Sequence, residues 1–178
     1  MIRERNKKPA AALDGEGLER LALFYAGRYS TTRFKLRAYL LRKLRERGWA
    51  GRGEPALDSL IERFERLGYV DDRAFASSRA SSLIRRGYGE RRVAEALRAA
   101  GIESGDSEGA REEAREGAWE AALRFARRKR IGPWADRAAD RDGRRKAAAA
   151  MLRAGHDMAH VRRLVDAAPG EIPDSDRD

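Results

Sequence analysis

The sequence predicts an all-α fold of tandem three-helix repeats that form an elongated, curved array. Apolar residues recur at helical spacing along the whole chain, and the alternation typical of strands is almost absent. Short Gly-containing segments separate the apolar stripes at regular intervals. Charged residues make up 38% of the 178 residues, and the mean hydropathy is −0.75. This composition favours small helical units with narrow apolar stripes over one thick core.

The first predicted repeat spans residues 18–70. Its clearest helix is expected over residues 57–67, because the apolar side chains there share one helix face. That face consists of Leu57, Leu60, Ile61, Phe64 and Leu67. Similar stripes predict helices around residues 18–25 and 34–44. The preceding residues 1–17 are polar, and we expect them to form a flexible N-terminal tail.

Two further repeats are predicted over residues 71–118 and 119–168. The third should contain helices near residues 119–130, 137–153 and 158–167. Residues 169–178 are polar and contain Pro and Gly, so we expect a flexible C-terminal tail.

Glycine followed by an apolar residue predicts where several helices end. Gly after the last helical residue adopts the left-handed conformation that closes a helix, and the next side chain folds back onto the last turn. These pairs are Gly48-Trp49, Gly68-Tyr69, Gly87-Tyr88 and Gly101-Ile102. The expected N-caps are Ser30 or Thr31, Asp71 or Asp72, and Asp157. Residues 104–107 are expected to form a break between helices.

Charge segregates along the chain, which carries a formal net charge of +10. Residues 28–47, 73–101 and 124–163 have net charges of +7, +5 and +9, whereas residues 54–72 and 103–120 have −4 and −5. Clustered cations favour binding to phosphate backbones or to an acidic protein surface. The alternative is that these arginines only solvate the helices and pair with acidic neighbours one turn away.

The candidate binding residues are cations on the outer faces of the basic helices. They are Lys35 and Arg42, Arg91 and Arg98, and Arg144 and Arg145. Residues seven apart lie on the same side of a helix, so the first two pairs each share a face away from the apolar stripe. Exposed aromatic rings between cations are typical of single-strand binders, and this pattern is weak here. Tyr39 and Trp134 are the two rings that merit testing as stacking platforms.

The composition excludes several classes of function. The chain has no Cys, and His156 and His160 provide too little for a histidine-rich site. We therefore expect no catalytic residue, no metal and no cofactor. Asp71 and Asp72 are interpreted as a helix N-terminus, where carboxylates are favoured, and not as a catalytic pair. The sequence contains no apolar run of spanning length and no secretory signal, so we expect a cytoplasmic protein without a membrane partner.

Three segments in the middle of the chain resemble the signature of the RecX family of regulatory proteins. They are Leu67-Gly68-Tyr69-Val70-Asp71-Asp72-Arg73-Ala74-Phe75-Ala76, Arg86-Gly87-Tyr88-Gly89-Glu90-Arg91-Arg92-Val93 and Leu97-Arg98-Ala99-Ala100-Gly101-Ile102. Ala96 and Ala100 depart from the family pattern, which has Glu and Lys at these positions. The resemblance covers residues 57–102, and the flanking segments agree in helix pattern alone.

The resemblance implies a function. RecX-like proteins bind the RecA recombinase, mainly as its filament on single-stranded DNA, and lower its ATPase, strand-exchange and SOS coprotease activities. The implied partners are therefore RecA, its nucleoprotein filament and single- or double-stranded DNA, with this chain acting as a monomer. The alternative is a non-specific DNA-binding helical module that acts independently of RecA.

Overall fold

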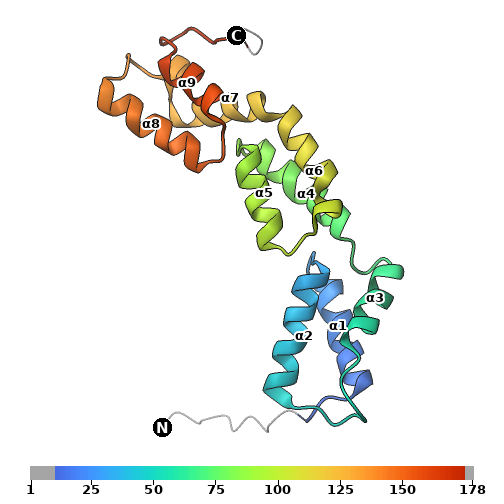
Figure 1. Ribbon diagram of the computed structural model, residues 1–178. Coiled ribbons are helices and arrows are strands. Elements are labelled where there is room, and N and C mark those ends of the chain that lie inside the picture. The colour runs from blue at the N-terminus through green and yellow to red at the C-terminus, as the bar shows by residue number, and fades with distance from the viewer. Residues whose placement is uncertain (1–10, 175–178) are drawn as a thin grey trace, which may run out of the picture. The chain divides into compact units, whose positions relative to one another are not determined.

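The computed structural model describes residues 11–174 (Figure 1). Over this range the regular elements are nine α-helices and one short 3-10 helix, which confirms the predicted all-α class. The one strand-like pairing in the range is an isolated bridge between Leu13 and Trp49. None of the described helices is long and apolar enough to cross a bilayer. The chain divides into two compact units, Met1–Asp72 and Arg73–Asp178.

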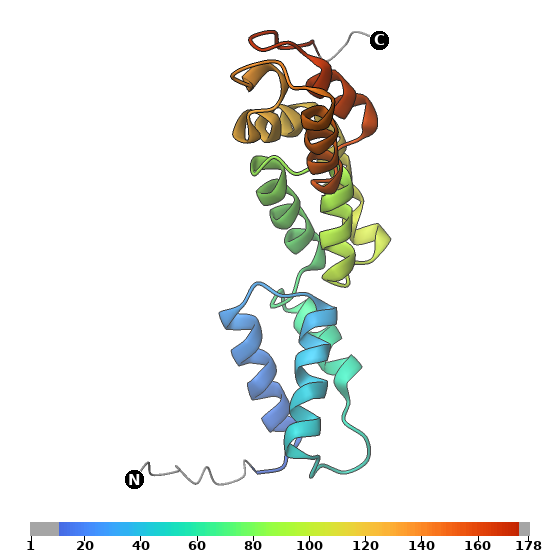
Figure 2. The same cartoon turned by 90° about the vertical axis from the view of Figure 1, so that its left-hand side faces the viewer.

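The first unit contains three helices, α1 (Gly15–Arg28), α2 (Arg33–Arg47) and α3 (Leu57–Arg66). Helix α2 packs against both of the others, as the two views show (Figures 1 and 2). Their apolar stripes meet in one core, as the spacing predicts. The buried core residues are Leu13, Leu18, Ala22, Leu36, Leu40, Leu57, Ile61, Phe64 and Val70.

The core of the first unit begins earlier than the expected boundary at Leu18. Leu13 is 1% exposed, and its backbone bonds to the carbonyl of Gly48 and the N–H of Ala50. Asp14 then caps α1 by accepting a 2.8 Å hydrogen bond from the Gly17 N–H. Residues 11–17 are thus tied to the core by the Leu13 side chain, by its two backbone hydrogen bonds, and by the Arg47 Nε, which donates to the Ala11 carbonyl at 2.8 Å. Residues 1–10 lie outside the described range.

The second unit contains the remaining elements, and α4 begins at the boundary between the units. They are α4 (Asp72–Arg85), α5 (Glu90–Ala99), α6 (Ser104–Glu116), α7 (Ala118–Lys129), η1 (Gly132–Trp134), α8 (Arg141–Arg153) and α9 (Met158–Asp166). Two apolar clusters fill this unit, and α7 contributes to both. Ala121 belongs to the cluster of α4–α6, while Ala122 and Phe125 belong to that of α7–α9. The second and third predicted repeats therefore share a helix within one compact unit.

The predicted glycine-terminated helix ends are confirmed. Gly48, Gly68, Gly87 and Gly101 have φ angles of 78°, 74°, 76° and 73°. After three of them the next N–H donates back across the last turn, as from Tyr69 to the Phe64 carbonyl at 2.9 Å. This bond and its equivalents at Tyr88 and Ile102 are the Schellman pattern, which satisfies carbonyls at the end of a helix.

Two boundary predictions are wrong, and one is confirmed. Residues 104–107, expected as a break, form the first turn of α6, where the Ser107 hydroxyl donates to the Ser104 carbonyl. Ser, Gly and Asp suit helix starts as well as loops, so composition alone misplaced this boundary. The N-cap of α2 is Thr32, one residue beyond the expected Ser30 or Thr31. Asp157 caps α9 as predicted, by accepting from the His160 N–H at 2.8 Å.

Candidate functional site

The six predicted cations lie on three helices in two units. Lys35 and Arg42 are on α2 of the first unit, Arg91 and Arg98 on α5, and Arg144 and Arg145 on α8 of the second. All are exposed except Lys35, which is half-buried in the first turn of α2. Their surroundings differ, and this difference decides which of them can attract an anionic partner.

The cations of α2 are largely engaged within the first unit. Arg42 pairs with Glu46 at 2.8 Å, and Lys43 pairs with the same carboxylate at 2.6 Å. Hydrogen bonds from Lys43 and Arg42 lower the pKa of Glu46 from its ordinary value. Arg37 pairs with Asp58 of α3. The charge of this helix is therefore partly neutralised by its own neighbours, which is the alternative that the sequence left open.

A buried carboxylate holds the start of α2 in place. Asp72 is 4% exposed, and its side chain accepts from the Arg33 N–H at 2.9 Å and from the Arg33 Nε at 3.2 Å. Arg33 also pairs with Glu65 of α3 at 3.3 Å. The sequence placed Asp72 at the start of its own helix, as the structure does. It gave no sign that this carboxylate binds a residue 39 positions away.

Helix α5 presents cations without such compensation. Arg91 and Arg98 are seven residues apart and share a face, and neither forms an ion pair within residues 11–174. Glu95, which lies between them, pairs with Arg92 at 2.6 Å instead. Within the described chain, no acidic side chain therefore compensates the positive charges of Arg91 and Arg98 at the surface.

The N-terminus of α5 abuts the C-terminal end of α8. The N–H groups of Gly89 and Arg91 donate to the carbonyls of Ala154 and Gly155 at 3.0 and 3.2 Å. The backbones approach so closely that a Cβ on Gly89 would collide with Gly155, and one on Gly155 would collide with Arg92. This joint fixes Arg91 against the end of α8, within the second unit.

The two predicted cations of α8 are not equivalent. Arg145 pairs with Asp142 on the preceding turn at 3.4 Å. Arg144 has no ion-pair partner in the described chain and lines a pocket beside α8. At about 1.5 Å per residue, Arg144 lies roughly 16 Å along the helix axis from Gly155 and the joint with α5. The second unit thus carries three exposed cations, with Arg91 at the C-terminal end of α8, Arg144 near its N-terminal end, and Arg98 in the last turn of α5.

The two aromatic residues singled out from the sequence are both partly packed. Tyr39 stacks on Tyr25 with ring centroids 4.2 Å apart, and the Arg42 guanidinium lies 5.4 Å from its centroid. Trp134 is half-buried against the α7–α9 cluster. One face of Tyr39 is therefore already occupied by another ring, which limits its use as a stacking platform.

The two histidines occupy different environments. His156 is 2% exposed, lies against Phe125 at 5.3 Å between centroids, and precedes the N-cap of α9. His160 is half-buried beside Asp157, at 2.5 Å, and Trp119. Burial lowers the pKa of His156 to about 4, against the opposing effect of the nearby Gly87 backbone. Residues 11–174 contain no group of three side chains arranged to hold a metal ion.

Known proteins similar to this chain agree on one family. A family model described as the second three-helix domain of RecX matches residues 71–110. The regulatory protein RecX of Myxococcus xanthus (strain DK1622) is 30% identical over 175 residues, covering 94% of each chain.

Solved structures support the same fold. The crystal structure of RecX from Lactobacillus salivarius matches with a TM-score of 0.61 at 18% identity, covering 85% of this chain and 94% of that one. A second crystal structure of regulatory protein RecX matches with a TM-score of 0.59 at 20% identity, covering 85% of this chain and 73% of that one. With nearly its whole length aligned at 30% identity to a curated relative, this chain belongs to the RecX family of regulatory proteins.

Proposed function

We propose that this protein binds the RecA filament on single-stranded DNA and restrains its recombinase, ATPase and coprotease activities. Membership of the RecX family supports a regulatory role. The observation that carries the proposal is the set of exposed cations on the second unit, Arg91, Arg98 and Arg144, which have no acidic partner in the described chain. Such cations attract an acidic protein surface or a phosphate backbone at long range.

The spacing of these cations suits an extended partner. Arg91 lies at one end of α8 and Arg144 near the other, roughly 16 Å apart along its axis by helix rise. A partner that contacts both must present anionic groups over a similar length. A nucleoprotein filament does so repeatedly, and a protein bound along it would bridge adjacent protomers and hinder filament growth.

A RecA ATPase assay on single-stranded DNA tests the proposal. We expect inhibition when this protein is present at well below one molecule per RecA protomer, because one bound molecule would block extension for many protomers. Inhibition that requires equimolar protein would indicate simple sequestration of RecA and contradict the filament mechanism. An order-of-addition series, with this protein added before or after filament assembly, separates blocked growth from disassembly.

A second candidate function is DNA binding independent of RecA, and one observation in the first unit favours it. Arg28 lies 5.8 Å from the Tyr29 ring, which is exposed, and Arg42 and Lys43 lie over Tyr39. Cations beside aromatic rings are the means by which single-strand binders hold phosphates and stack bases. Titration with single-stranded DNA at several salt concentrations, with and without RecA, distinguishes the two. Equal affinity without RecA and a steep salt dependence would favour the DNA-binding module.

A further inference from the structure

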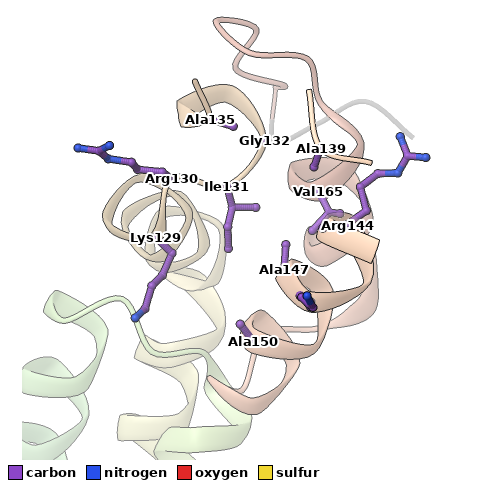
Figure 3. Close-up of a pocket in the computed structure, with 12 residues that line it drawn as sticks. Lys129, Arg130, Ile131, Gly132, Ala135, Ala139, Arg144, Ala147, Ala150 and Val165 are labelled. Atoms are coloured by element: carbon purple, nitrogen blue, oxygen red, sulfur yellow. The ribbon is translucent and has the colours of Figure 1, made fainter. Parts of the chain in front are cut away.

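A pocket in the second unit lies between the end of α7, η1, α8 and α9 (Figure 3). Its volume is about 360 Å³, within the range of ligand sites. The space exists because α8 presents alanines there. Ala147 and Ala150 face Ile131 and Val165 across the pocket, and larger side chains at these alanines would fill it.

The floor of this pocket is aliphatic. Ile131 and Val165 are buried members of the α7–α9 cluster, and Ala147 and Ala150 pack against it. Figure 3 shows these four side chains directed toward one another. The floor therefore offers dispersion contacts and no hydrogen-bond partners, and it suits an aliphatic group of a ligand.

The rim of the pocket is cationic. The charged residues that line it are Lys129, Arg130, Arg144 and Lys146, and no acidic residue of the range 11–174 lines it. Arg130 makes a long, exposed contact of 3.6 Å with Asp136, whereas the other three have no ion pair in the described chain. Lys129, Arg130 and Arg144 reach outward from the pocket (Figure 3), so an anion would bind at its margin rather than on its floor.

We propose that this pocket binds an acidic peptide segment of a partner protein, with one aliphatic side chain on the floor and flanking Asp or Glu carboxylates on the rim. The charge of the rim selects an anionic partner by complementarity. The floor selects a peptide over nucleic acid, because none of the described residues lines the pocket with an aromatic ring or a neutral polar side chain that could stack on or bond to a base. This inference goes beyond the proposed function and does not depend on RecA.

The test measures binding of fluorescent peptides to the full chain by anisotropy. One peptide carries two leucines flanked by glutamates, a second has serines in place of the leucines, and a short oligothymidine serves as the nucleic-acid probe. We expect the leucine peptide to bind about tenfold more tightly than the serine peptide, since its apolar side chain is buried. Equal binding of both peptides, or tighter binding of oligothymidine, would overturn the proposal.

Charge variants locate the site. R144E combined with K146E should lower the affinity for the leucine peptide by about tenfold or more. R145E combined with R141E is the matched control, because both residues lie on the same helix and do not line the pocket, and the net charge changes equally. It should change affinity by less than about threefold. An equal loss from both would mean that net charge and not the pocket binds the peptide.

A pair of uncharged variants tests the floor. A150L fills the pocket and should remove the advantage of the leucine peptide over the serine peptide, while A149L adds the same volume at a position that does not line the pocket and should retain it. Circular dichroism of both verifies that α8 is intact.

I172S tests whether this chain's own segment Glu171–Asp174 occupies the pocket, with Ile172 as its apolar side chain. The segment begins close to η1, because the Gly170 N–H donates to the Pro133 carbonyl. Peptide affinity should be unchanged in I172S, and a gain would assign the pocket to that segment and overturn the proposal.

Discussion

Helix α2 and the pair α5 and α8 are both rich in cations, yet they use them differently. On α2, Arg33 binds the buried Asp72, Arg37 pairs with Asp58, and Arg42 and Lys43 share Glu46. On α5 and α8, the described chain gives Arg91, Arg98 and Arg144 no acidic partner. The net charge of a segment therefore does not give the number of cations that can bind a partner, because some of them form ion pairs within the fold.

The largest expected effect concerns the structural use of charge on α2. D72N should lower the free energy of unfolding by about 3 kcal/mol, because it replaces the charged acceptor of two hydrogen bonds from Arg33 at a position that is 4% exposed. Urea unfolding followed by circular dichroism measures it. D58N is the control, since the Asp58 side chain is 74% exposed and its pair with Arg37 should contribute less than about 1 kcal/mol. A similar small loss for both would mean that Asp72 does not anchor α2.

The second prediction concerns the exposed cations of the other region. The triple reversal R91E, R98E and R144E should raise the concentration for half-inhibition of RecA ATPase about a hundredfold, at roughly 1 kcal/mol for each reversed charge. The matched control reverses three ion-paired residues, R42E, K43E and R145E, and so changes the net charge equally. It should change inhibition by less than about tenfold. Equal losses would show that net charge alone governs binding.

A buried histidine in the second unit makes the stability of the protein depend on pH. The His156 pKa of about 4 is below the unfolded value of about 6.5, so the unfolded chain binds the proton more readily. The contribution of His156 to the free energy of unfolding is thus fully present above pH 6.5 and decreases as the pH falls toward 4. Near pH 5 the loss is about 2 kcal/mol relative to neutral pH. Asp157, His160 and Arg128 also act on this ring.

Urea unfolding at several pH values measures this loss. H156L should flatten the dependence of stability on pH between about pH 6.5 and 4, where the wild-type loss occurs. H160L is the control and should retain most of the dependence of stability on pH. A variant H156L that retains the full slope would assign the pH dependence to other groups.

The sequence was sufficient to predict most helices, but it was insufficient to predict which charged side chains pair with one another. Helical periodicity and terminal glycines are local signals, and they located most of the helices. The starts of α6 at Ser104 and of α8 at Arg141, expected near residue 137, were misplaced, and η1 was not expected. The resemblance over residues 57–102 identified the family. By contrast, the bond from Arg33 to Asp72 spans 39 residues, and the pocket beside Ala147 depends on four separate elements, α7, η1, α8 and α9. Contacts of this kind follow from tertiary packing, which residue spacing along one helix does not encode.

The smallest expected effect tests whether the aromatic residues of α2 belong to the structural or the binding region. Y39L removes the ring that stacks on Tyr25 at 4.2 Å and lies beneath Arg42 and Lys43. It should cost about 1 kcal/mol of unfolding free energy, the usual value of an aromatic pair beyond its buried area. RecA inhibition should remain within about twofold of the wild type, since the Tyr39 ring is covered by Tyr25, Arg42 and Lys43 and offers little surface for stacking a base. A loss of inhibition at unchanged stability would instead place α2 in the binding surface and favour the DNA-binding alternative.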